Sequence, residues 1–227
     1  DHQLRFFFFG SDDELRLVVD NPTFDVNVRS NSVSASSSFV RGIVEHDWTP
    51  SDELKITTKI ATGTDNVAFS GFGLFTFNLD IYQPAWRETI EYKISEQSKL
   101  RLGLDVLWAK VDINIRAPLP PKEGDSEREV SSDDFLAFSQ NNVRERNAAG
   151  FVELELEAFD GLLFIPGARV DYYETLQDFT FDPRLTVRYN IDEQWALKSG
   201  AGLFHQAPLP DESSAGDFGN PDLLAEG

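Results

Sequence analysis

Apolar and polar residues alternate along most of this chain with a period of two. The clearest case is 99–115, where Leu, Leu, Leu, Val and Trp take the even positions from 100 to 108, opposite Arg101, Gly103 and Asp105. Successive side chains of a strand point to opposite faces, so this segment forms a ribbon with one apolar and one charged face. Convincing helical periodicity is absent, and the pattern predicts an all-β chain.

The alternation predicts about ten strands, which cover residues 2–9, 15–20, 33–46, 53–61, 86–95, 99–115, 143–158, 162–173, 183–190 and 194–204. Short connections such as 95–98 and 160–161 alternate with long ones, at 62–83, 117–141 and beyond 205. In 99–115 the apolar residues move to odd positions after Trp108. This change predicts a β-bulge near Ala109 and Lys110.

The apolar ladder 100–108 has nearly the ~9–11 residues that a tilted strand needs to cross a bilayer. Aromatic residues near predicted strand ends match the girdle of a membrane barrel: Trp48, Trp86, Tyr92, Tyr189 and Trp195. A cation facing lipid would cost about 2–4 kcal/mol at the midplane, so the charged face would turn away from lipid. A sheet with one face in water explains the same alternation, and spacing alone leaves both interpretations open.

In a barrel, the charged rows of neighbouring strands would line the lumen. The predicted lumen-lining residues are Glu153, Glu155, Glu157, Arg184, Arg188 and Lys198. The glutamates would offset the cations of nearby strands.

Composition limits the function classes. A net charge of −19 excludes a nucleic-acid partner, because no basic stripe is available for phosphates. The absence of cysteine excludes disulfides and thiolate metal sites. The chain begins at Asp1 without a signal peptide, so either the mature protein begins there or the sequence is part of something longer.

Five stretches, taken in order, resemble the C-terminal half of a TonB-dependent outer-membrane receptor barrel. They are residues 150–156, 163–173, 182–189, 200–208 and 218–226. The family patterns they resemble are PGxRxDYY, PRxxxRY, GxGxFxQAP and GNPxLxPE, and Ala225 stands where the last usually has proline. The motif residues singled out are Pro166, Gly167, Pro183, Gly219, Asn220 and Pro221.

The resemblance implies about ten strands of a 22-stranded, antiparallel, up-and-down transmembrane barrel, with residues 1–227 as one partial barrel domain. The family's plug domain, TonB box and terminal strand ending in an aromatic residue have no counterpart in the stretches that resemble it. We therefore expect the middle of a longer barrel, which cannot close alone.

The resemblance also implies nutrient uptake, not catalysis, in the outer membrane of a Gram-negative bacterium. The ligand would be a ferric siderophore, a corrinoid or a glycan, and the partners would be TonB with its inner-membrane energising complex, and outer-membrane lipid. Residues near the loops and upper lumen are the candidate ligand-binding residues: Phe135, Phe138, Arg169, Asp171, Tyr172, Tyr173, His205 and Gln206.

Two other function classes remain. A soluble all-β carbohydrate-binding module would stack sugars on Trp and Tyr, but it should interrupt 100–108 with polar residues or cover it with a second sheet. A β-sandwich hydrolase would use an Asp/Glu pair. We predict no cofactor and no metal, because the three histidines lack a shared spacing and acidic clusters such as 12–14 are usually solvated.

Overall fold

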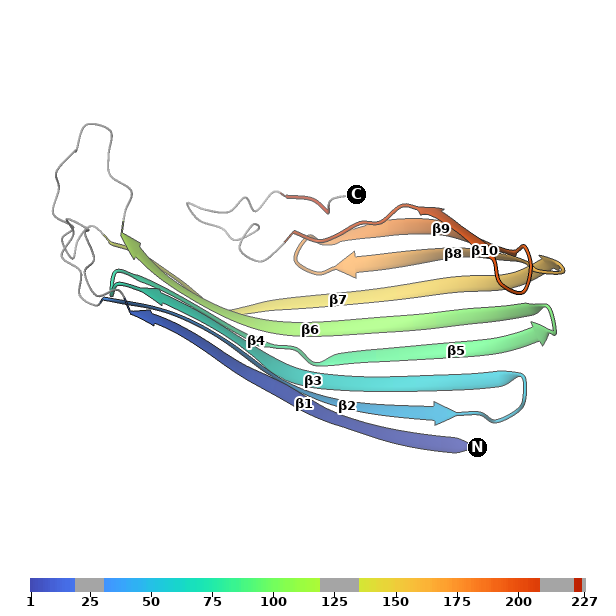
Figure 1. The fold of residues 1–227 in the computed structure, drawn as a ribbon, viewed down its shortest axis with the longest axis horizontal. Coiled ribbons are helices and arrows are strands. Elements are labelled where there is room, and N and C mark those ends of the chain that lie inside the picture. The colour runs from blue at the N-terminus through green and yellow to red at the C-terminus, as the bar shows by residue number, and fades with distance from the viewer. Residues whose placement is uncertain (19–30, 119–134, 209–222, 226–227) are drawn as a thin grey trace.

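The computed structural model describes residues 1–18, 31–118, 135–208 and 223–225. Within these residues, ten strands form one antiparallel sheet, long and strongly curved (Figure 1). The strands are β1 (His2–Val18), β2 (Ser32–Trp48), β3 (Leu54–Gly71), β4 (Phe75–Tyr82), β5 (Ala85–Ser95), β6 (Ser98–Pro118), β7 (Phe135–Phe159), β8 (Leu162–Tyr173), β9 (Asp178–Asn190) and β10 (Ala196–Gly202). The predicted all-β class is confirmed. No helix among the described residues is long and apolar enough to cross a membrane.

β4 and β5 act as one interrupted strand between β3 and β6. From Phe75 to Lys93, apart from residues 83–84 that separate them, they pair with these two neighbours in one continuous register. The interruption falls at Pro84, which has no N–H to donate but whose carbonyl accepts the N–H of Trp108 at 2.9 Å. The sheet otherwise follows the chain order from β1 to β10.

The two ends of the sheet differ in their connections. Four short connections, at residues 49–53, 96–97, 160–161 and 191–195, lie at the end where β1 begins, on the right in Figure 1. We call this the tight-turn end. Strands β3, β4, β6 and β7 extend far toward the opposite end, whereas the β8–β9 turn lies near the middle of the sheet.

The pairing register separates two faces that we name by their shape. The convex face carries the even residues of β6 from Leu100 to Trp108, and the concave face carries Arg101, Gly103 and Asp105. The concave assignment rests on one hollow of ≈490 Å³ that is lined from β2 through β9 by side chains of this face.

Residues 62–83, predicted as a long loop, are instead ordered as the end of β3, a tight turn and β4. Likewise, 2–9 and 15–18 belong to the single strand β1, while 19 and 20, the end of the second predicted strand, lie outside the described residues. β7 begins at Phe135, inside the predicted connection 117–141. The reason is a reversal of chemistry: beyond Trp108 the convex face becomes polar and the concave face apolar. When the apolar residues move from one face of a strand to the other, the alternation is interrupted. In the sequence this interruption resembles the end of the strand.

The predicted bulge near Ala109 is wrong in position. Around Ala109, β6 keeps one register against β4 and β5, and the nearby shift lies in its pairing with β7, between Val111 and Ile113. The extra residue is on β7, where Asn142 has a φ of 63°. Asparagine tolerates this left-handed conformation better than most residues.

Asp112 stabilises this bulge, and we expect that stabilisation to depend on pH. Its Oδ1 accepts the backbone N–H of Asn142. That hydrogen bond and Lys110 hold the pKa of Asp112 below its usual range. Because the folded pKa is depressed, the stabilisation exists above the ordinary aspartate pKa and is lost as the pH falls through the folded value. We expect amide exchange at Asn142, corrected for intrinsic rates, to be protected near pH 7 and to lose protection below about pH 4.

The Asp112→Asn variant supplies the control for this measurement. Its side chain does not titrate, so protection of Asn142 should no longer change between about pH 7 and about pH 3. A pH dependence that persists unchanged in the variant would show that another group controls the bulge.

Candidate functional site

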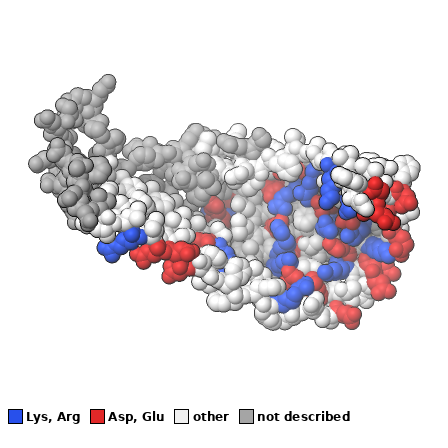
Figure 2. Space-filling model, viewed as in Figure 1, with Lys and Arg blue, Asp and Glu red and all other residues white. Residues whose placement is uncertain are grey.

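The concave face at the tight-turn half of the sheet is covered by interleaved charges (Figure 2). Six cationic and five anionic side chains line the ≈490 Å³ hollow on this face. They come from seven strands, because alternate residues of each strand point to the same side. We call this surface the charged wall; its cations are Lys55, Lys59, Arg87, Arg101, Arg169 and Arg184, and its anions are Glu45, Asp47, Glu91, Asp105 and Glu153.

Arg101 is the centre of one group of ion pairs in the charged wall. Its guanidinium lies 3.0 Å from Glu91, 3.0 Å from Glu153 and 3.4 Å from Glu155. These carboxylates come from the strands on either side of β6. Lys99 adds a second cation to Glu155, at 3.1 Å. One arginine therefore joins β5, β6 and β7 through side chains in addition to the backbone ladder.

Arg184 extends this group across an intervening strand. In register, Glu153, Gly167 and Arg184 lie side by side on β7, β8 and β9. Gly167 has no side chain, so Arg184 reaches over it to Glu153 at 2.8 Å. A Cβ at position 167 would lie 3.1 Å from Glu153 Cγ and 3.3 Å from Arg184 Nε. This glycine keeps the space in which the pair forms.

Arg169 forms the second group, toward the middle of the sheet. It lies 2.7 Å from Asp105 and 2.8 Å from Asp171, and Arg87 also pairs with Asp105. Asp105 on β6 is thus bridged to β5 and, across β7, to β8. Two of the candidate ligand-binding residues, Arg169 and Asp171, are already paired with each other and with the wall.

The third group lies on β1, β2 and β3. The alternation placed Lys55 and Lys59 on the charged face, but Arg5, Glu45 and Asp47 were not predicted there. Arg5 pairs with both Glu45 and Asp47. Lys59 lies 2.6 Å from Glu45, and Lys55 lies 3.3 Å from Asp47. Alternation in 33–46 carries the signal for Glu45, whereas the unbroken apolar run after Arg5 hides the parity of β1.

The candidate residues of β8 divide between the two faces. Tyr173 is buried at 8% exposure on the concave face. Tyr172 points to the convex face, where its ring lies 4.6 Å from that of Phe179. His205 contacts Asp182 through its ring and donates its backbone N–H to the same carboxylate at 3.2 Å. Asp182 is in register with Arg169. Arg169, Asp171, Tyr173 and His205 therefore gather on one side, apart from Tyr172.

The remaining candidates take different positions. Gln206 is exposed, and its side chain forms no hydrogen bond with this group among the described residues. The side chains of Phe135 and Phe138 lie outside the described ones, as do residues 219–221 with the Gly-Asn-Pro motif. Pro166 and Pro183 lie on the convex face, across the sheet from Gly167.

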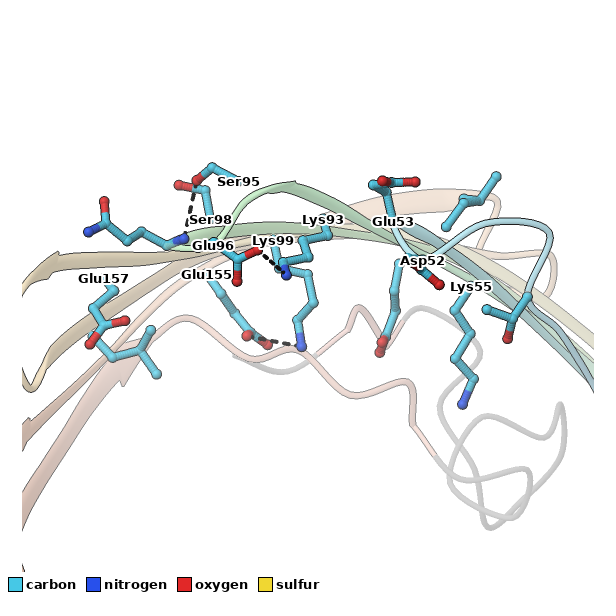
Figure 3. A pocket seen from close by; sticks show the side chains of 15 residues that line it. Asp52, Glu53, Lys55, Lys93, Ser95, Glu96, Ser98, Lys99, Glu155 and Glu157 are labelled. Carbon is cyan, nitrogen blue, oxygen red and sulfur yellow. Dashed lines mark hydrogen bonds and ion pairs between the residues drawn. The ribbon is translucent and has the colours of Figure 1, made fainter. Parts of the chain in front are cut away.

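Of the predicted lumen-lining residues, Glu153, Glu155 and Arg184 take part in the ion pairs above. Arg188 donates to Asn190 at 3.0 Å. Within the described residues, Glu157, Arg188 and Lys198 form no ion pair. Near the tight turns, Glu155 and Glu157 line a second hollow of ≈370 Å³ together with Lys55, Lys93 and Lys99 (Figure 3).

The convex face is apolar and uncovered at the level of the charged wall. Leu102 and Leu104 are 40% and 52% exposed, and Trp108 is 55% exposed. Aromatic residues mark both limits of this surface. The exposed ones are Trp48, Tyr92 and Tyr189 at the tight-turn end and Trp86 and Trp108 at the other, where the half-buried Tyr172 also lies. Glu88 interrupts it, in register with Thr58 and Leu104.

Beyond Trp108 the two faces exchange character. Val111 and Ile113 on the concave face are 3% and 5% exposed and, with Ala109, form the buried apolar cluster of the described residues. They pack with Phe77, Leu79, Ile81, Ile115 and Val143. The convex face here carries Lys110, Asp112 and Asn114. This stretch of the sheet therefore has a polar outer surface.

Gly103 makes room for an aromatic ring in the charged wall. The ring of Phe151 occupies the place of a side chain, because a Cβ at position 103 would lie 2.1 Å from Phe151 Cε1. We expect Gly103→Ala to displace this ring and to lower the free energy of unfolding by about 1–3 kcal/mol. Denaturant unfolding of the purified protein measures the change.

Gly200→Ala is the matched control, because its Cβ would meet only ordinary contacts, at 3.7 Å and 3.8 Å. It should leave stability unchanged or raise it by about 0.4–1 kcal/mol through the unfolded state. Equal losses in the two variants would show that Phe151 does not need the space at Gly103.

Comparison with known proteins identifies the same architecture. A family model described as "TonB dependent receptor-like, beta-barrel" matches residues 4–226. The siderophore receptor PirA from Pseudomonas aeruginosa is similar with a TM-score of 0.50 and 14% identity, over 86% of this chain and 43% of PirA. The outer membrane transporter YddB from Escherichia coli is similar with a TM-score of 0.50 and 10% identity, over 84% of this chain and 27% of YddB.

The chain thus spans less than half the length of either solved protein. At these identities the similarity shows a shared fold. No curated protein matches the sequence.

Proposed function

The chain belongs to the TonB-dependent receptor-like β-barrel family, and from this premise we propose that it forms part of the barrel wall of an active-uptake receptor in the outer membrane. The convex face would meet lipid and the charged wall would line the lumen. The tight turns would lie on the periplasmic side and the extended strands would project outward, as short turns and long loops do in such barrels.

One observation carries this proposal: the charged and apolar surfaces lie back to back on the same strands. Arg101 and Asp105 point to one side while Leu102 and Leu104 stand exposed on the other. Eleven charges on the lipid side would be prohibitive, whereas a watery lumen solvates them. The exchange of character beyond Trp108 supports the same orientation, because the outer surface there would leave the bilayer and meet water.

The soluble carbohydrate-binding module is not favoured by this arrangement. Such a module needs a second layer over Leu100–Trp108, and no second sheet covers that surface within the described residues. An exposed apolar surface of this extent is typical of proteins that meet a membrane or a partner. The family is one of transporters rather than enzymes, and we propose no catalytic residue.

We propose that the ligand is a scarce small-molecule nutrient, with a ferric siderophore as the first class to test because PirA is a siderophore receptor. Corrinoids and glycans are the next ligand classes to test. The group of Arg169, Asp171, Tyr173 and His205 is our candidate contact surface, since it gathers donors and acceptors on the concave face. TonB with its inner-membrane complex would supply the energy.

Uptake by the source cell tests this function. Strains lacking either this protein or TonB are given radiolabelled ferric siderophores, cobalamin and oligosaccharides, each at limiting concentration. We expect both deletions to abolish uptake of the same one class, and the intact gene to restore it in the first strain. Normal uptake of every class in the strain without this protein would overturn the proposal.

A further inference from the structure

A groove runs along the convex face above β7. Its floor is Ala148 and Gly150, the two smallest side chains of the convex row of this strand. Leu104 and Val106 form one wall, and Tyr172 with Phe179 forms the other. The groove has a volume of ≈260 Å³ and lies within the apolar surface. Its apolar lining suits a hydrocarbon chain.

Basic side chains stand at one end of this groove, beyond the aromatic limit at Trp108. Continuing from Ala148, the convex row of β7 carries Arg146 and then Arg144. Lys110 of β6 is in register with Arg144, and Trp108 is in register with Arg146. The guanidinium of Arg146 lies 5.8 Å from the centre of the Trp108 ring. Three cations thus meet directly where the apolar groove ends.

The neighbouring carboxylates do not neutralise this group. Glu174 lies 3.4 Å from Arg146, which is long for a charge-assisted hydrogen bond, and Asp112 lies 3.0 Å from Lys110. Arg144 has no ion pair among the described residues. The side chains of Arg146 and Lys110 remain 49% and 47% exposed. Donors are therefore available to an anion that approaches from the outside.

We propose that this surface binds a phosphorylated lipid of the outer leaflet, with an acyl chain in the groove and a headgroup phosphate held by Arg144, Arg146 and Lys110. Cations just beyond an apolar band are positioned for lipid phosphates, and arginine binds phosphate through paired N–H donors. The groove and the cations come from separate observations and meet at the depth where a chain joins its headgroup. The inference depends on the convex face meeting lipid and not on uptake.

Native mass spectrometry of the full protein in detergent, with added bis-phosphorylated lipid A, tests this binding. Each surface cation contributes roughly 1 kcal/mol toward an anionic lipid, which is about a fivefold factor in affinity. We expect Arg144→Gln combined with Arg146→Gln to weaken binding about twenty-fivefold. Arg16→Gln, a cation on the same face of distant β1, is the control and should bind as the wild type does. Equal binding by the double variant and the wild type would overturn the proposal.

A second pair of measurements separates the chain from the phosphate. Lipid A stripped of both phosphates should bind the wild type and the double variant equally and weakly. Ala148→Leu fills the groove at an exposed position and should weaken both forms of the lipid. Unchanged binding by Ala148→Leu would exclude the groove as the acyl site. Retention of β-sheet circular dichroism confirms that each variant is folded.

Discussion

Val152→Arg is expected to lower the free energy of unfolding by about 2–4 kcal/mol, the largest effect of any single substitution we predict. Val152 is 40% exposed on the convex face of β7. Its register neighbours are Leu102 and Ala168, so a cation there would have lipid and apolar side chains around it. Unfolding by urea of the protein folded into lipid vesicles measures the loss.

Leu107→Arg is the control for this prediction. Leu107 lies on the concave face of β6, next to Ala85 and Asn147 in register and on the same side as Asp105. An arginine there would have water and a carboxylate within reach, so stability should change by less than about 1 kcal/mol. A larger loss at Leu107 than at Val152 would reverse the assignment of the two faces.

Arg101→Gln is expected to have the second-largest effect, about 2 kcal/mol of stability. The substitution removes the shared partner of Glu91, Glu153 and Glu155. Glu153 retains Arg184 and Glu155 retains Lys99, but Glu91 has no other ion pair among the described residues. The like charges that remain would then repel one another across β5, β6 and β7.

Arg188→Gln provides the comparison, because Arg188 lies on the same face but, among the described residues, its side chain hydrogen-bonds to Asn190 and forms no ion pair. Its loss should cost less than about 0.5 kcal/mol. Adding Glu91→Gln to Arg101→Gln should recover part of the lost stability, because it removes the unpaired carboxylate. Equal unfolding midpoints for Arg101→Gln and Arg188→Gln would show that the Arg101 group contributes nothing to stability.

The alternation of residues was sufficient to predict the strand segments that carry the apolar convex face between its two aromatic limits, which we call the apolar band. Leu100 to Trp108 is such a case, because its even residues are apolar over the whole length and the opposite side carries Arg101 and Asp105. The class, the approximate number of strands and the family resemblance were confirmed. The charge compensation between β7 and β9 was predicted in outline, and Arg184 with Glu153 realises it.

Residues beyond the band could not be placed by the same rule. In 62–83 the large aliphatic and Phe side chains, such as Val67, Phe77 and Leu79, face inward, whereas Asn66, Asn78 and Asp80 face outward, so the pattern changes sides within a strand. The bulge at Asn142 was missed because its backbone shift leaves no trace in the apolar pattern of β6. Long-range pairs such as Arg169 with Asp105 depend on register across three strands, which spacing within one strand cannot supply.

The near balance of the charged wall determines how a solute would experience it. With six cations and five anions, the lining carries a net charge of +1, although the chain as a whole carries −19. The electric fields of opposite charges a few ångströms apart largely cancel at larger distances. Physiological salt screens the remaining field over about 8 Å. The lining therefore produces almost no electrostatic steering at long range. In the proposed lumen, selection by this wall would therefore depend on close contact, where a passing molecule would exchange one ion-pair partner for the next.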